Sequence, residues 1–218
     1  MNDAEDANRG AQIVFRLQPL IRLEDGALYG EEVLAGQDRC PDYALGEWIS
    51  WYEHFLPQIR KLVRAGSKRL FVNVSTEQLA DDRIFEMFQL MPHATHVVLE
   101  WTEHRLAGGN DEAVALALER LTFLRRIGFQ MAVDDVGHGE DGLGRVLALR
   151  PEVVKIDGDL FRALRGRRGG HAFLSGITAA LGAIGSVVVV EHIESLDDLA
   201  YAKAAGVHCG QGRFFEAS

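Results

Sequence analysis

The sequence predicts an α/β fold, a TIM-like (β/α)8 barrel with an antiparallel first strand. Three observations lead to this prediction. Short runs rich in β-branched residues alternate with longer helical patterns along the 218 residues. The dipeptide Asp25-Gly26 lies between the first two runs and is a hairpin signal. Polar residues follow most of the later runs, at the positions where barrel strands end.

The expected strands extend through most of the chain. They are Val14–Leu17, Leu28–Leu34, Leu70–Val74, His96–Glu100, Phe129–Asp134, Glu152–Ile156, Val187–Glu191 and Val207–Gly210. Only the turn Leu23–Gly26 separates the first two, so we expect these strands to pair antiparallel. The barrel would then begin with a strand that runs against the rest.

Helical periodicity fills the intervals between the later strands. The expected helices are Ala44–Ala65, Ser75–Phe88, Asp111–Ile127, Leu160–Ile184 and Ser195–Ala205. Ser75 followed by Gln78 is a capping-box pattern, which indicates where the second helix begins. The segment Gly166–Gly170 is rich in glycine, so we expect Leu160–Ile184 to form two pieces.

Composition indicates one globular domain at residues 11–218, preceded by a disordered start at residues 1–10. Hydrophobic residues make up 47% of the chain, close to the average for soluble domains. The net charge is -9, from 23 basic and 32 acidic residues. Duplex nucleic acid is normally bound by a basic surface, so the charge argues against that partner. A small phosphate ligand stays compatible, because metal ions can supply the local positive charge.

The cysteines and the apolar segments predict a cytoplasmic protein without membrane contact. Cys40 and Cys209 form neither a CxxC pair nor a zinc-binding spacing, and two reduced thiols are the ordinary interpretation. Residues Met1–Gly10 lack the basic-then-apolar order of a signal peptide. The most apolar stretch, Leu181–Val190, is too short to span a bilayer.

Polar residues at the strand ends predict a metal site. They are Asn73, Glu100, Asp134, Asp135, Lys155, Asp157, Glu191 and Gln211. In a parallel barrel all strands open on one face, so these side chains should meet there. Clustered carboxylates repel one another unless a cation neutralises them, and oxygen ligands suit Mg²⁺ or Mn²⁺. Taken singly, each residue could instead be a helix cap, a turn residue or a surface ion-pair partner.

At these positions the sequence resembles the EAL domain family of cyclic-di-GMP phosphodiesterases. The resemblance rests on ordered motifs over almost the whole chain: Gln18-Pro19, Gly30–Leu34, Phe71–Ser75, Leu99–Glu103, Asp134–Gly139, Lys155–Asp157, Glu191–Glu194 and Gly210–Gly212. Glu32 matches the family's signature glutamate, in the pattern Gly-Glu-Glu-Val-Leu. Several motifs in this order make a specific signal, which no single motif would.

The resemblance implies hydrolysis of cyclic di-GMP to the linear dinucleotide pGpG with two Mg²⁺ or Mn²⁺ ions. It assigns one metal to Glu32, Asn73, Glu100 and Asp134, and a second to Asp134, Asp135 and Glu191. It implies that Lys155 positions the attacking water or helps to deprotonate it, so that Lys155, Glu191 and Asp135 are the expected catalytic residues. It gives supporting roles to Gln18, Glu103, Asp157, Glu194 and Gln211.

The sequence departs from the family pattern where the substrate is expected to bind. Gly36 stands where the family usually has an arginine suited to a phosphate, and Arg39 is a nearby substitute. The segment between Glu32 and Asn73 is short by about one helix relative to the family. The loop Val136–Gly142 lacks the family's aromatic and serine residues, in a segment that couples metal binding to dimer contacts.

These departures leave alternatives open. The chain could be a catalytically weak or inactive module that acts as a cyclic-di-GMP receptor or binds a protein partner. The substrate could also be another nucleotide, and a homodimer stays open. His138 could be a ligand or a pH-sensitive group, although a solvated loop histidine is the more ordinary interpretation. His192 and Glu194 are expected to support the site rather than to react.

Overall fold

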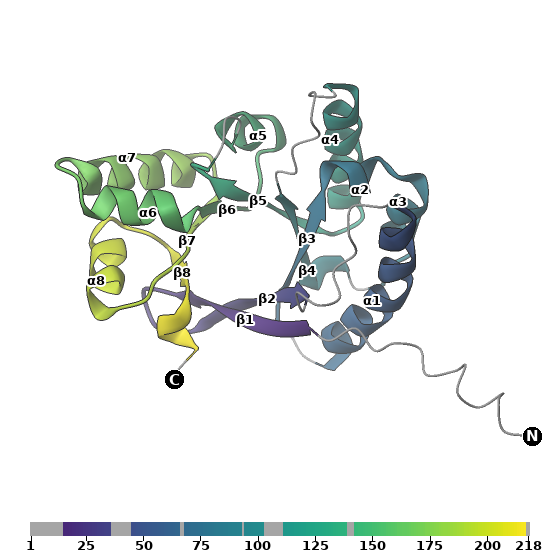
Figure 1. The fold of residues 1–218 in the computed structure, drawn as a ribbon, viewed down its shortest axis with the longest axis horizontal. Helices are drawn as coiled ribbons and strands as arrows, with labels where there is room; N and C mark the ends of the chain where they lie inside the picture. The colour runs from purple at the N-terminus through teal and green to yellow at the C-terminus, as the bar shows by residue number, and fades with distance from the viewer. Residues whose placement is uncertain are drawn as a thin grey trace, which may run out of the picture.

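The computed structural model describes residues 15–35, 45–65, 68–92, 94–102, 111–138 and 142–216. Within these ranges, eight strands form a closed barrel in the order β1 to β8, and the helices lie outside it (Figure 1). The strands are β1 Phe15–Arg22, β2 Leu28–Ala35, β3 Leu70–Ser75, β4 Val97–Thr102, β5 Gln130–Val136, β6 Val153–Ile156, β7 Val187–Val190 and β8 Cys209–Gln211. The predicted fold class is confirmed.

The first strand runs against its two neighbours, as predicted. β1 pairs antiparallel with β2 and with β8, whereas the six pairs from β2 to β8 are parallel. The turn between β1 and β2 ends at Gly26, whose φ of 72° lies in the left-handed region that glycine adopts without strain. The Asp25 side chain accepts a hydrogen bond from the Ala27 backbone N–H at 3.0 Å and so stabilises this turn.

The helices agree with the sequence predictions except at two places. They are α1 Leu45–Ala65, α2 Thr76–Ala80, α3 Asp82–Gln89, α4 Asp111–Arg126, α5 Gly142–Leu149, α6 Gly158–Arg165, α7 Gly170–Ala183 and α8 Leu196–Ala204, with short 3-10 helices at Ala94–His96 and Arg213–Phe215. The expected split of Leu160–Ile184 is confirmed, since Gly169 takes a φ of 84° between α6 and α7.

The prediction of one helix over Ser75–Phe88 is wrong. Asp81 takes an extended conformation that ends α2, and its carboxylate caps α3 by accepting hydrogen bonds from the Arg83 and Ile84 backbone N–H groups. Helix α5 was not predicted at all, because it is short and begins in a glycine-rich loop.

The predicted disordered start at residues 1–10 and the Cys40 thiol lie outside the described residues. Cys209 is a free, buried thiol.

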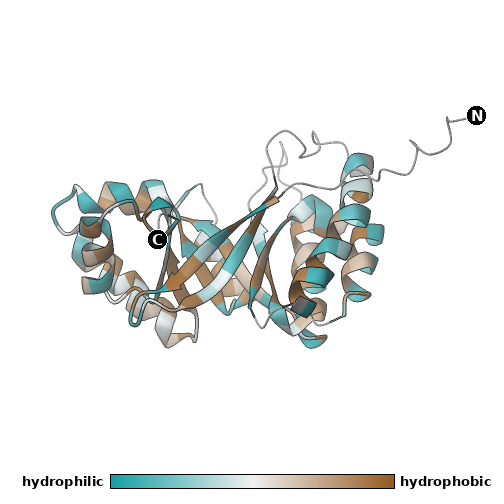
Figure 2. Ribbon diagram, turned by 90° about the horizontal axis from the view of Figure 1, so that it is seen from below, coloured by the Kyte–Doolittle hydropathy of each residue, from teal (hydrophilic) through white to brown (hydrophobic). Residues whose placement is uncertain are grey.

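The hydrophobic core has two parts. The larger part lies between the outside of the barrel and the helices, and the smaller part fills the barrel interior. In Figure 2 the strands are largely brown, whereas teal residues gather on the helices. Among the described residues, no helix has the length and apolarity needed to cross a membrane.

The capping box predicted at Ser75 is present, and its loss gives a test of the local fold. The Ser75 hydroxyl accepts from the Gln78 N–H at 3.3 Å, while the Gln78 side chain accepts from the Ser75 N–H at 2.9 Å. Ser75→Ala should lower the free energy of unfolding by about 1 kcal/mol. Urea denaturation measures this change, with Ser50→Ala on the exposed face of α1 as the control. Equal stabilities for the two variants would contradict the capping role.

Candidate active site

Two layers of side chains fill the barrel interior. The lower layer is apolar and takes one residue from each of seven strands: Leu20, Phe71, Val98, Ala132, Val153, Val189 and Cys209. The upper layer is polar and lies two residues further along β3 to β8: Asn73, Glu100, Asp134, Lys155, Glu191 and Gln211. Side chains alternate along a strand, so residues two apart face the same side. The polar layer therefore lies at the carboxyl ends of the parallel strands, where barrel enzymes place their sites.

The two N-terminal strands complete the polar layer. Gln18 lies two residues before Leu20, because β1 runs in the opposite direction. Glu32 on β2 lies opposite both Gln18 and Phe71 in the strand register. The structure thus brings together residues that are widely separated in the sequence.

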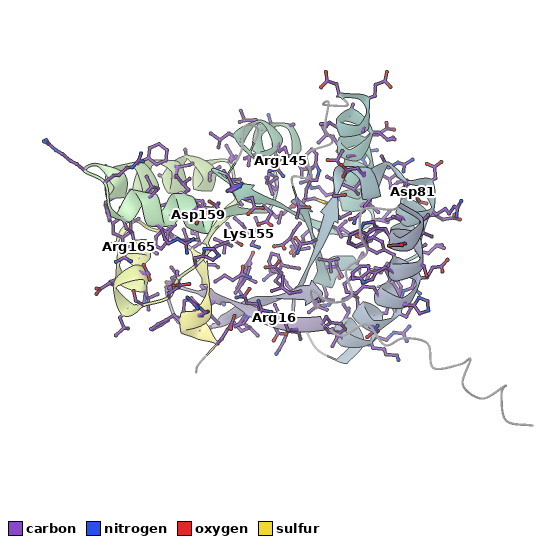
Figure 3. The ribbon with its side chains drawn as sticks, in the orientation of Figure 1. Arg16, Asp81, Arg145, Lys155, Asp159 and Arg165 are labelled. Carbon is purple, nitrogen blue, oxygen red and sulfur yellow. The ribbon has the colours of Figure 1, made fainter. Side chains whose placement is uncertain are left out.

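Lys155 lies at the centre of this layer. Its Nζ is 3.0 Å from Glu32 Oε2, 3.2 Å from Glu100 Oε1, 3.2 Å from Asp134 Oδ1 and 2.9 Å from Glu191 Oε1. The side chain is 1% exposed, and Figure 3 shows Lys155 within the ring of strands. Burial lowers the pKa of Lys155, but the surrounding carboxylates outweigh it and hold that pKa well above the ordinary value. Lys155 is therefore a buried ammonium ion among four carboxylates.

Glu32 is the best-satisfied carboxylate of the layer. Its Oε1 accepts from Asn73 Nδ2 at 2.9 Å, and its Oε2 accepts from Gln211 Nε2 at 2.6 Å. Burial raises the pKa of Glu32, but the Lys155 charge and these hydrogen bonds outweigh burial and lower the pKa to about 2. Glu32 is therefore ionised and held in a fixed orientation.

Glu100 and Glu191 hold their protons more strongly than ordinary carboxyl groups, because Lys155 alone does not offset their burial and the negative charge around them. Burial and the charge of Glu32 raise the pKa of Glu100 well above its ordinary value. Burial, opposed by the Lys155 charge but assisted by that of Asp134, raises the pKa of Glu191 to about 7. One ammonium faces four acidic groups, so the cluster has room for further positive charge.

Several buried oxygen atoms of the layer receive no hydrogen bond from the described residues. They are Asn73 Oδ1, both carboxylate oxygens of Glu100, Asp134 Oδ1 and Gln211 Oε1. Two of them, Glu100 Oε1 and Asp134 Oδ1, face the Lys155 ammonium as ion pairs at 3.2 Å. Oxygen atoms of Asp134, Asp135 and Glu191 also lie within 4.8 Å of one another. Buried oxygens without donors are costly, and hard divalent cations bind such carboxylate and amide oxygens. These residues therefore fit divalent metal ions.

Asp135 reaches the site through an irregular backbone. In a regular strand it would point away from Asp134. The β5–β6 register shifts between Val133 and Val136, and Asp135 has a φ of 55° in the left-handed region. Such strain in a residue other than glycine is often found at functional sites. Burial and the Asp134 charge raise the pKa of Asp135.

The predicted supporting residues divide into two groups. Gln211 and Gln18 belong to the layer, since Gln211 Nε2 donates to Gln18 Oε1 at 2.9 Å. Asp157 instead caps α6 by accepting from the Asp159 and Leu160 N–H groups, and Glu194 forms an exposed ion pair with Arg213 at 2.8 Å.

The remaining predicted positions lie either at the edge of the polar layer or outside the residues that the structure describes. The exposed His138 ring lies 3.9 Å from Asp157 Oδ1, and His192 has a φ of 57°. Glu103, Gly36 and Arg39 lie outside the described residues.

Sequence reasoning missed Arg145, which lies behind the polar layer. It is 5% exposed and donates hydrogen bonds to the backbone carbonyls of Trp101 and Asp134. The sequence signal for this residue is a single arginine among the apolar residues of Gly142–Leu149. That signal has meaning only if a helix is predicted there.

The buried ammonium of Lys155 should be important for stability. Lys155→Met keeps an unbranched side chain that is one atom shorter, but leaves the carboxylates without their cation. We expect the free energy of unfolding at pH 7 in EDTA to fall by about 3–5 kcal/mol. Urea denaturation measures this loss, with Lys68→Met as the control, since Lys68 forms only an exposed ion pair with Glu31. Similar losses in the two variants would count against a cationic role for Lys155.

The comparisons with known proteins point to one family. A family model described as EAL domain matches residues 45–218. Cyclic di-GMP phosphodiesterase RocR of Pseudomonas aeruginosa is 28% identical over 220 residues, which cover 91% of this chain and 55% of RocR. Cyclic di-GMP phosphodiesterase PdeR of Escherichia coli is 27% identical over 180 residues, which cover 78% of this chain and 26% of PdeR. The chain therefore spans only part of the length of these relatives.

Solved structures show the same fold. The EAL domain protein from Listeria monocytogenes superimposes with a TM-score of 0.76 at 19% identity, over 99% of this chain and 93% of that one. YkuI of Bacillus subtilis, solved with cyclic di-GMP and calcium, gives a TM-score of 0.74 at 22% identity, over 95% of this chain and 55% of that one. At these identities the likeness establishes the barrel and leaves the chemistry to be argued from the residues.

Proposed function

Because the chain belongs to the EAL domain family, we propose that it is a metal-dependent phosphodiesterase that hydrolyses cyclic di-GMP to pGpG. The observation that carries this proposal is the polar layer, in which Glu32, Asn73, Glu100, Asp134 and Glu191 surround Lys155. Glu32 precedes the part of the chain that the family model matches, yet it lies in this layer. The names of RocR and PdeR support the same reaction.

We propose that the layer holds two Mg²⁺ or Mn²⁺ ions. Glu32, Asn73, Glu100 and Asp134 would bind the first, and Asp134, Asp135 and Glu191 would bind the second. The buried oxygens that lack donors support this assignment, and YkuI and BlrP1 of Klebsiella pneumoniae have been solved with calcium and the dinucleotide. Two cations, when bound, supply the Lewis acidity that activates a water and stabilises the leaving oxygen.

The residues of the chain then have distinct tasks. Glu32, oriented by Asn73 and Gln211, keeps a fixed negative charge in the layer. The Lys155 ammonium lies among the carboxylates of the layer, so we assign it the positioning of the attacking water by hydrogen-bond donation. Gln18 lies beside Gln211 at the mouth, where it can donate to the substrate. A soluble dinucleotide substrate agrees with the predicted cytoplasmic location.

A second candidate function is a cyclic-di-GMP receptor or protein-binding regulator with weak or no turnover. One observation favours it: Gly36 replaces the arginine that would bind a substrate phosphate. The metal residues would then serve binding alone. A homodimer, or a protein partner in the inactive case, stays a prediction from the sequence.

A binding experiment separates these functions. Isothermal titration of the purified chain with cyclic di-GMP in Ca²⁺ should detect binding, and exchange of Ca²⁺ for Mg²⁺ or Mn²⁺ should give pGpG. Binding in Ca²⁺ without product in Mg²⁺ or Mn²⁺ would favour the receptor. Absence of binding at high micromolar nucleotide would contradict both nucleotide functions and favour a protein-binding regulator.

A further inference from the structure

Arg145 connects helix α5 to the two strands that carry Glu100 and Asp134. Its Nη1 donates to the Trp101 carbonyl at 2.6 Å, and its Nη2 donates to the Asp134 carbonyl at 3.1 Å. The guanidinium also lies over the Trp101 ring, with 5.7 Å between its carbon and the ring centroid. Figure 3 shows Arg145 where α5 meets the barrel. One planar side chain thus bridges the main chains of β4 and β5.

The bridge lies where regular strand pairing ends. The parallel register of β4 and β5 runs from Val98 opposite Gln130 to Trp101 opposite Val133. Beyond that point β5 bulges, and Asp135 takes its left-handed conformation. Buried carbonyl groups need donors when a ladder stops. Arg145 supplies them to the residue that follows Glu100 and to Asp134 itself.

An arginine is an unusual choice for this buried position. Burying a guanidinium costs free energy that an apolar residue on α5 would not cost. Its planar fork has two donors in fixed geometry, so it can hold two acceptors at a set spacing, which lysine cannot do. The Trp101 indole is fixed in turn, since its Nε1 donates to Thr76 Oγ1 at 3.0 Å. The Arg145 guanidinium therefore packs against an indole ring whose own position is fixed by a hydrogen bond.

We propose that Arg145 is a positioning residue, which holds β4 and β5 at the spacing that Glu100 and Asp134 need in order to bind the same metal ion. This inference rests on the proposed function, because it assigns both carboxylates to one metal. The role assigned to Arg145 is exerted through the two carbonyl groups that it holds, and not as a ligand of the ion. Its loss should therefore change the affinity for the metal rather than the chemistry of the bound complex.

The test measures Mn²⁺ binding to Arg145→Met and Arg145→Lys by isothermal titration, with circular dichroism as the check on folding. Arg145→Met should bind Mn²⁺ roughly 10–100-fold more weakly than the unmodified chain, as is typical when a partner of a metal ligand is lost. Arg145→Lys should also bind more weakly, because one ammonium cannot hold both carbonyls in the same geometry.

Arg125→Met is the matched control. Arg125 on α4 also donates to two main-chain carbonyls, those of Leu149 at 3.0 Å and Arg150 at 3.1 Å. This pair lies before β6, at the end of the barrel opposite the polar layer. We expect Arg125→Met to bind Mn²⁺ within about twofold of the unmodified chain, even where it loses stability.

A second readout separates positioning from general destabilisation. The rate of cyclic-di-GMP hydrolysis by Arg145→Met should reach half its maximum at a higher Mn²⁺ concentration and recover as Mn²⁺ is raised. A purely structural loss would lower the rate at every Mn²⁺ concentration.

The outcomes distinguish this inference from the proposed function. An unmodified chain that binds no Mn²⁺ would overturn the proposed metal chemistry and the inference together. A folded Arg145→Met that binds Mn²⁺ as tightly as the unmodified chain would overturn the inference alone. If Arg145→Met does not fold, Arg145→Lys decides, and an unchanged Mn²⁺ affinity in that variant would overturn the positioning role.

Discussion

Asp134→Asn is expected to lower kcat for cyclic di-GMP by about 10³-fold or more, which corresponds to the several kcal/mol that metal ions contribute to such a displacement. Asp134 is the one residue assigned to both metals, and its buried Oδ1 forms an ion pair with Lys155 but accepts no hydrogen bond from the described residues. Asparagine keeps the size of the side chain but removes the charge. It would also present either an amide oxygen or an N–H group to Lys155, whose Nζ lies 3.2 Å from Oδ1.

The measurement for Asp134→Asn is steady-state production of pGpG at saturating Mn²⁺. Asp197→Asn, at an exposed position in the first turn of α8, is the matched control and should keep the unmodified rate. Circular dichroism confirms that both variants are folded. A rate for Asp134→Asn within tenfold of the control would contradict the assignment of Asp134 to both metals.

Glu32→Gln should lower kcat by roughly 10²–10³-fold, an effect of about 3–4 kcal/mol on the barrier. The carboxylate accepts hydrogen bonds from Asn73 and Gln211 and pairs with Lys155 at 3.0 Å. A glutamine has one acceptor oxygen, so its amide N–H group would face one of these donors. The change therefore removes a metal ligand and also disorders the groups that orient it.

The neighbouring residue gives a closely matched control for Glu32→Gln. Glu31 lies on the same strand, and its side chain pairs with Lys68 on the other face of the sheet at 3.4 Å. Glu31→Gln should keep the rate of pGpG production within about twofold, since an exposed ion pair contributes little. Equal rates for the two glutamine variants would show that the signature glutamate has no part in hydrolysis.

Much of the fold could be predicted from the sequence because barrel strands carry local signals. Apolar runs, the Asp25-Gly26 turn and the capping residue Ser75 each indicate one element, and the structure contains all of them. The polar layer could be anticipated for a similar reason. A polar residue at the end of an apolar run needs only the period of two to face the barrel interior.

The features that could not be predicted depend on contacts between distant segments. Asp135 was expected at the site, but the sequence gives no sign of the bulge of β5 against β6 that brings it there. In the sequence Arg145 is a single polar residue in an apolar segment. Only the structure shows that it donates hydrogen bonds to carbonyl groups on β4 and β5. Asp157 matched a family motif, but a strand-terminal aspartate can equally cap the next helix, and in the structure it does.

Hydrolysis of cyclic di-GMP by the purified chain in Mg²⁺ or Mn²⁺ tests the central proposal most directly, with product separated from substrate by chromatography. The arrangement of Glu32, Asp134 and Lys155 predicts that pGpG accumulates and that EDTA stops its formation. No pGpG from a folded chain that binds Mn²⁺ would contradict the phosphodiesterase and leave the polar layer as a binding site without turnover.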